Sequence, residues 1–240
     1  MTTYLEPTQE RAPLRVRIAA PSPSVFAVRL GLAGIVLSAL FMTNLTVTAW
    51  DRMSILNTTM SDYVFVPKVG WMFEAALMCM AVAGIGVMAG LAAIRLLGSG
   101  LLRFALGLAV LGSLLAAVFR TDLGESLSTS AQIHRYAAGV VFFCVPIAAF
   151  LVARQLTGVG YQARYRKWLY ANVIVTSAVL ALFMTSHFGV MPEMLRELNG
   201  LFQRMLFVLE LILLGQIVLL PLRFRAPAAA PVRIPAQRVR

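Results

Sequence analysis

Six long apolar stretches constrain the fold of this chain more than any other feature of its sequence. Each runs for 16 to 21 residues between ionisable residues, and a helix needs roughly 20 apolar residues to cross a bilayer. The stretches are 30–50, 75–94, 104–119, 136–153, 168–186 and 205–222. The third is the shortest, and we expect Leu101 and Leu102 to lengthen it while Arg103 reaches back to the interface.

The stretches are continuously apolar and lack the alternation that marks a membrane barrel strand. A helix also satisfies its own backbone hydrogen bonds inside hydrocarbon. The sequence therefore predicts an all-α protein, a polytopic transmembrane bundle of six helices. The first stretch is too long for the apolar region of a signal peptide and is followed by no small-residue cleavage motif, so we expect it to stay as the first membrane helix.

Composition argues against a soluble protein, because 60% of the residues are hydrophobic and only 13% are charged, against about 25% in a typical soluble domain. The net charge of +11 would suit a nucleic-acid partner. However, the basic residues lie between the apolar stretches and form no separate basic domain. We expect membrane lipids as partners and no nucleic acid. Cys79 and Cys144 lie inside apolar stretches and predict no disulfide, and no cofactor or metal is expected.

The basic residues also predict the orientation of the bundle. Segments 1–29, 95–103, 154–167 and 223–240 hold 15 of the 21 Lys and Arg residues, and the connections on the other side hold the remaining six. Because cytoplasmic loops carry the excess of Lys and Arg, we predict that both termini are cytoplasmic, in the plasma (inner) membrane of a bacterium.

Three regions follow from this reading. Residues 1–25 and 225–240 contain several prolines and few residues that could form a core, so we predict disordered cytoplasmic tails, the second of them basic. Residues 26–224 between them form the six-helix transmembrane domain.

Side chains capable of acid–base or metal chemistry gather on the predicted outer side. Both histidines, His134 and His187, fall there, whereas Glu6 and Glu10 lie inside. Seven of the ten acidic residues also lie outside, namely Asp51, Asp62, Glu74, Asp122, Glu125, Glu193 and Glu197. This distribution favours a polar pocket that opens to the outside.

Glu210 is the remaining acidic residue, about 9 Å into the sixth stretch at a rise of 1.5 Å per residue. A charged side chain at that depth costs on the order of 2.5–3.5 kcal/mol, so we expect it to face the bundle interior, paired or protonated. It could be a proton, ion or headgroup site, or a structural interhelical hydrogen bond. Arg204 lies on a different face of the same helix, and we expect it to meet an outer carboxylate such as Glu74 or Asp122.

The outer loop over residues 119–135 allows further arrangements. Ser130 is expected to cap the fourth helix, which would let Asp122 approach His134. A His–Asp pair near serines is a feature of hydrolases, but the sequence contains no Gly-x-Ser-x-Gly elbow. The pair His134 and His187 could also bind haem, or zinc with the help of nearby carboxylates.

Several short motifs on the outer side resemble the bacterial domain-of-unknown-function family 998. They are Ser61-Asp62-Tyr63 followed by Gly70-Trp71, Phe119-Arg120-Thr121-Asp122 with His134 downstream, and Gly200-Leu201-Phe202-Gln203-Arg204. Arg120 and Gln203 stand where that family usually has a proline and an acidic residue. The resemblance covers approximately residues 28–222, and it implies a six-helix bundle without an established activity.

These observations favour a non-enzymatic membrane protein with an outward-facing pocket for a lipid headgroup or a small polar ligand, although whether the protein is an enzyme stays open. The residues expected to line the pocket are Glu74, Arg120, Asp122, His134, His187, Arg204 and Glu210. One alternative is a proton-coupled transporter that titrates Glu210. The other is a metal-dependent membrane hydrolase built on His134, Asp122 and His187.

Overall fold

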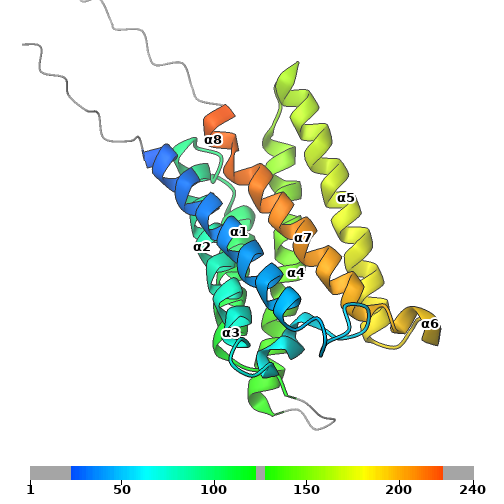
Figure 1. Cartoon of the computed structure of the whole chain (residues 1–240). Coiled ribbons are helices and arrows are strands. Elements are labelled where there is room, and N and C mark those ends of the chain that lie inside the picture. Colours follow the sequence, from blue (N-terminus) through cyan, green and yellow to red (C-terminus); the bar gives the residue numbers. More distant parts are fainter. Residues whose placement is uncertain (1–22, 123–127, 224–240) are drawn as a thin grey trace, which may run out of the picture.

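The computed structural model describes residues 23–122 and 128–223, which form helices and no strands. The predicted all-α class is therefore confirmed. The tails expected over 1–25 and 225–240 lie almost entirely outside the described residues. In chain order the elements are α1 Pro23–Thr48, the 3-10 helix η1 Met60–Phe65, α2 Trp71–Ala93, α3 Gly100–Val118, α4 Thr129–Gln155, α5 Tyr161–His187, α6 Glu193–Arg196, α7 Asn199–Val218 and α8 Leu220–Arg223 (Figure 1).

Six helical segments of the described chain are long and apolar enough to cross a membrane, as predicted; α7 and α8 together form the sixth. Their outward faces carry apolar side chains such as Phe26 and Phe104, each 63% exposed. Trp50, Trp71 and Trp168 are exposed near helix ends, where tryptophan is enriched at membrane–water interfaces. The chain is thus a multi-pass membrane protein.

The bundle has two distinct ends. Both ends of the described chain lie together at one of them, and η1 and α6 lie at the other, called here the η1 end (Figure 1). Residues 23 and 223, the two ends of the described chain, therefore lie at the same end of the bundle. The cytoplasmic location of that end follows from the charge distribution alone and stays a prediction.

Small residues bring α1 and α2 into backbone contact. A Cβ added at Gly86 would lie 2.4 Å from the backbone nitrogen of Gly31, and one at Gly34 would lie 2.6 Å from the carbonyl oxygen of Cys79. Ser38 adds a hydrogen bond from its hydroxyl to the carbonyl oxygen of Ala76, at 2.8 Å. Close packing of this kind holds helices together in lipid, because the hydrophobic effect does not drive their association there.

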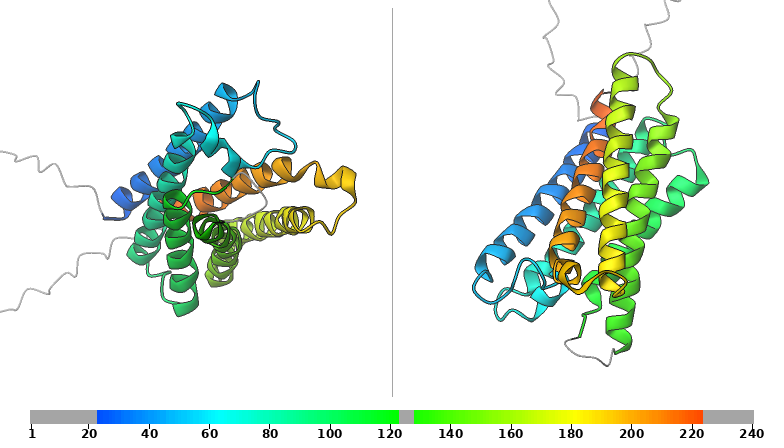
Figure 2. Two further views of the ribbon diagram at one scale, coloured as in Figure 1. Left: turned by 90° about the horizontal axis from the view of Figure 1, so that it is seen from below. Right: turned by 90° about the vertical axis from the view of Figure 1, so that its right-hand side faces the viewer.

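Helix α7 packs against α1, α2, α4 and α5, whereas α5 packs mainly on α4 and α7 at the edge of the bundle (Figure 2). Helices α4 and α5 meet at a short connection opposite the η1 end and diverge toward the η1 end (Figure 1). The main core lies among α1–α4, α7 and the first half of α5. A second, smaller apolar cluster of α5 and α7 contains Phe183 and Leu206.

Candidate functional site

A cavity of about 820 Å³ opens at the η1 end, between η1, the start of α4, the end of α5 and the start of α7. Its lining changes character along α4. Gln132, His134 and Arg135 come first, Ala138 and Gly139 follow, and Phe142 and Phe143 lie two turns from Arg135. At 1.5 Å per residue, the change from charged to aromatic side chains takes about 10 Å. The remaining lining residues are Thr59, Ser61, Asp62, Thr121, Asp122, Tyr136, Phe183, Met184, His187, Phe188 and Gln203.

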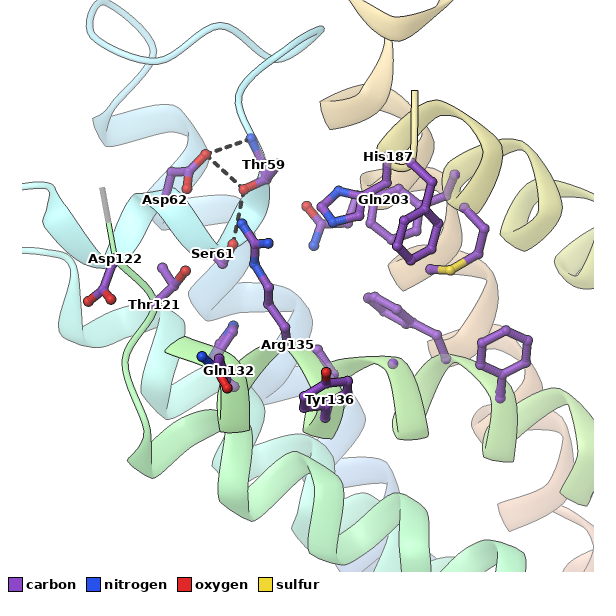
Figure 3. Close-up of a pocket in the computed structure, with 18 residues that line it drawn as sticks. Thr59, Ser61, Asp62, Thr121, Asp122, Gln132, Arg135, Tyr136, His187 and Gln203 are labelled. Atoms are coloured by element: carbon purple, nitrogen blue, oxygen red, sulfur yellow. Dashed lines mark hydrogen bonds between the residues drawn. The ribbon is translucent and has the colours of Figure 1, made fainter. Parts of the chain in front are cut away.

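The wall formed by η1 is ordered by a capping box at its first turn. The backbone N–H and the hydroxyl of Thr59 donate to Oδ2 of Asp62, at 3.1 Å and 2.7 Å. The hydroxyls of Thr59 and Ser61 lie 3.0 Å apart (Figure 3). Gln203 of α7 accepts a hydrogen bond from the backbone N–H of Met60 at 2.7 Å. These bonds fix η1 against α7, so this polar wall has a defined shape.

Arg204 holds the loop before η1 against α7. Its Nη1 donates to the carbonyl oxygens of Ile55, Thr58 and Gly200 at 2.8–2.9 Å. Its Nη2 donates to the Tyr63 hydroxyl at 2.8 Å. The prediction that Arg204 meets an outer carboxylate was wrong, because backbone carbonyls of a tightly folded loop supply the acceptors instead. Arg204 is not among the residues that line the cavity.

The start of α4 is organised by the residues that precede it. Ser128, not Ser130 as predicted, caps the helix by accepting a hydrogen bond from the N–H of Ala131 at 3.2 Å. Ser130 donates its hydroxyl to the carbonyl oxygen of Arg120 at 2.9 Å. Asp122 Oδ2 accepts from the N–H of Ser128 at 2.7 Å. The hydroxyl and the N–H of Ser128 hold the pKa of the Asp122 carboxyl below its usual value, so Asp122 carries a full negative charge near neutral pH.

His134 and His187 both line the cavity, but each is held differently. His134 is buried, and its Nδ1 lies 2.8 Å from the carbonyl oxygen of Ala116 and 2.9 Å from that of Phe119. Because both neighbours accept, Nδ1 carries the proton and donates to them. The ring of His187 lies between those of Phe183 and Phe188, with centroids 5.7 Å and 5.5 Å away.

No His–Asp hydrogen bond joins His134 to Asp122 within the described residues, since His134 Nδ1 is committed to backbone carbonyls. Over residues 23–122 and 128–223, no group of three or more His, Cys, Asp or Glu side chains is arranged to hold a metal ion. The geometry therefore gives the hydrolase alternative neither its catalytic pair nor its metal.

Four of the seven residues expected to line the pocket do not line this cavity. They are Arg204, described above, and Glu74, Arg120 and Glu210. Glu74 and Arg120 form an ion pair with each other, with Nε of Arg120 2.6 Å from Oε1 of Glu74. Glu210 is fully buried, as predicted, but within the described residues neither of its carboxyl oxygens has a hydrogen-bond partner. Of the two expected states of Glu210, paired or protonated, the structure shows no pairing partner among residues 23–122 and 128–223.

A narrow extension of about 40 Å³ leads inward from the cavity, with His134, Ala138, Phe142 and Gln203 shared between the two spaces. Phe207 lines its inner part. Glu210 follows on the same face of α7, since residues 203, 207 and 210 recur at helical spacing.

Several residues of the cavity carry no specific signal in the sequence. Arg135 counts in the sequence only as one of six basic residues on the predicted outer side. Thr59 and Phe183 carry no motif, and their roles arise from contacts between elements far apart in the chain. Ser61 and Gln203 lie in motifs of the family resemblance, which was the one available indication of them, and Asp62 was indicated both by a motif and by its place among the acidic residues of the predicted outer side.

A model of the protein-of-unknown-function family DUF998 matches residues 25–219. The chain belongs to this family. No curated protein and no solved structure matches it. In this DUF998 protein, the motifs at 61–63, 119–122 and 200–204 all lie at the η1 end, where they line the cavity or hold η1 in place. The chain is an integral membrane protein of a family without an assigned activity.

Proposed function

We propose that this protein binds a membrane amphiphile in the cavity at the η1 end. The polar headgroup would lie between η1 and the start of α4, and the apolar part would lie between α4 and α5. One observation carries the proposal: the lining changes from charged and hydroxyl-bearing residues to aromatic ones within two turns of α4. A small polar ligand would leave the aromatic half unused, whereas a lipid uses both halves.

The position of the opening supports a ligand that comes from the membrane. Tyr136, Phe143 and Phe188 line the cavity and are also 75%, 49% and 73% exposed. Exposed aromatic residues beside a cavity let it open sideways to the lipid as well as at the end of the bundle. An amphiphile could then enter without leaving the membrane, because its chain stays in an apolar environment throughout.

Gly139 offers a direct test, because it lines the cavity and a Cβ added there meets no atom within 4 Å. Gly139→Trp should fit the backbone and fill the cavity. We expect native mass spectrometry in mild detergent to show a retained lipid on the unmodified protein, and about tenfold less of it on the variant.

Gly107→Trp is the matched control. Gly107 is also a helical glycine whose added Cβ meets nothing within 4 Å, but it lies on α3 outside the cavity. It should retain lipid like the unmodified protein. Equal retention by both variants, with both folded by circular dichroism, would contradict the proposal.

A proton-coupled carrier is the second candidate, favoured by the unpartnered, fully buried Glu210 carboxyl. Such a carrier needs a polar route across the bundle. In the described residues, the cavity and its extension lead from the η1 end as far as Phe207 on α7, and a carrier would need this route to continue to the other end of the bundle.

A further inference from the structure

The charged residues of the cavity are arranged in a definite order. What this order implies about the ligand rests on the proposed function. Figure 3 shows Asp62 and Asp122 on one side of Arg135, and Gln203 and His187 on the other side. Three phenylalanines lie deeper, Phe142 and Phe143 two turns along α4 from Arg135 and Phe183 one turn before the end of α5. Passing from the rim inward, the order is carboxylates, then guanidinium, then aromatic rings.

The acidic part of the cavity offers hydrogen-bond acceptors. The hydrogen bonds from Ser128 hold the pKa of the Asp122 carboxyl below its usual value, so the group is ionised near neutral pH. Asp62 uses Oδ2 for the capping box, and its Oδ1 has no partner among the described residues. The lining here contains no aromatic ring other than Tyr136, which lies past Arg135 on α4. An organic cation bound in this part would therefore be held by hydrogen bonds from its N–H groups to the carboxylates.

Arg135 supplies the positive charge of the polar half. Its side chain extends from α4 toward Ser61 of η1 (Figure 3). It is exposed, and within residues 23–122 and 128–223 it forms no ion pair or hydrogen bond. A free guanidinium presents a planar set of donors that matches the oxygens of a phosphate group.

We propose that the cavity selects a phospholipid with a phosphoethanolamine headgroup. Its primary ammonium would donate to Asp62 and Asp122, its phosphate would bind Arg135, and its acyl chains would lie along the aromatic half. The order of ammonium, phosphate and chain in such a lipid is the order of complementary groups in the cavity.

Two other headgroups fit less well. A phosphocholine ammonium has no N–H to donate, and quaternary ammonium groups are recognised by aromatic cages, which the acidic part lacks. A phosphoglycerol headgroup carries a net negative charge and would meet two carboxylates without a compensating ammonium. The cavity should therefore rank phosphoethanolamine above both.

The test uses delipidated full-length protein and three dihexanoyl lipids, with phosphoethanolamine, phosphocholine or phosphoglycerol headgroups. Binding constants are measured by titration with native mass spectrometry. We expect phosphoethanolamine to bind about tenfold more tightly than the other two, the effect of one charge-assisted hydrogen bond. A preference for phosphoglycerol, or no preference, would overturn the inference.

Two variants separate the roles of the charges. Asp122→Asn keeps an acceptor for Ser128 but removes the charge, so it should weaken phosphoethanolamine binding more than phosphocholine binding, and phosphoethanolamine should lose most of its advantage. Arg135→Gln should weaken all three lipids. Asp51→Asn and Arg52→Gln, an exposed pair outside the cavity, are the matched controls and should change nothing.

The outcomes also distinguish this inference from the proposed function. If Gly139→Trp removes the bound lipid but Asp122→Asn leaves the advantage of phosphoethanolamine intact, the cavity binds amphiphiles and the headgroup assignment is wrong. If Gly139→Trp leaves lipid binding intact, the proposed function itself is wrong.

Discussion

Glu210 is a carboxyl group in the middle of a membrane bundle without a hydrogen-bond partner in the described residues. A buried polar group without partners lowers stability, and replacing it with an apolar side chain of similar shape often raises stability. We expect Glu210→Met to stabilise the detergent-solubilised protein by about 1–3 kcal/mol, measured as a higher midpoint of thermal unfolding. Methionine is flexible enough to fill the space of the glutamate.

Glu210→Gln is the control for shape, because it keeps the size and the polarity of the side chain. Its amide needs partners as well, so it should gain less stability than Glu210→Met. A clear loss of stability in Glu210→Met would mean that the Glu210 carboxyl binds a ligand, such as a transported ion. This result would favour the carrier candidate.

Single residues show which part of the site can be predicted from sequence. Asp122, His134 and His187 are polar residues beside apolar stretches, and such residues tend to line cavities at the ends of helices. Arg204 was placed wrongly because charged residues suggest charged partners, whereas its acceptors are carbonyl oxygens. Every residue has a carbonyl, so the fold of a loop decides which of them converge.

The contact between α1 and α2 gives a prediction for whole helices. A Cβ at Gly86 would lie 2.4 Å from the Gly31 nitrogen and 2.9 Å from the Ala27 carbonyl oxygen, so the two helices would have to separate. We expect Gly86→Ala to destabilise the protein by about 1–3 kcal/mol through overpacking, measured by thermal unfolding followed by circular dichroism.

Gly107→Ala provides the comparison, since its added Cβ meets no atom within 4 Å. Alanine favours a helix over glycine by about 1 kcal/mol, so this variant should be as stable as the unmodified protein or more so. Similar midpoints for the two variants would show that the small residues of α2 do not set the distance to α1.

Helices were easier to predict than their ends. All six stretches became helices, but the helices run on through flanking charged residues; α4 begins at Thr129, seven residues before the apolar stretch at Tyr136. Ionisable residues end the hydrocarbon region without ending the helix, whereas a cap such as Ser128 or a turn such as Gly160, with φ of 62°, sets the boundary. The short elements η1, α6 and α8 have too few residues to show a period.

The arrangement of the helices in the bundle could not be predicted from the sequence. An apolar stretch indicates a membrane helix but not its neighbours, because lipid-facing and buried residues are equally apolar. The cavity lies where α4 and α5 diverge, and α7 packs against both helices. The distribution of charges could therefore predict that polar residues gather at one end of the bundle, but not where the cavity lies or that half of it is aromatic.

The orientation of the bundle decides which leaflet supplies the ligand, and it can be tested on one chain. In a background with Cys79→Ala and Cys144→Ala, a cysteine is placed at exposed Asn57, at the η1 end, or at exposed Gly98, in the connection between α2 and α3. Because Lys and Arg are concentrated on the side of the termini, a membrane-impermeant maleimide should label Asn57→Cys in intact cells. It should label Gly98→Cys only after permeabilisation. The opposite pattern would place the cavity in the cytoplasmic leaflet.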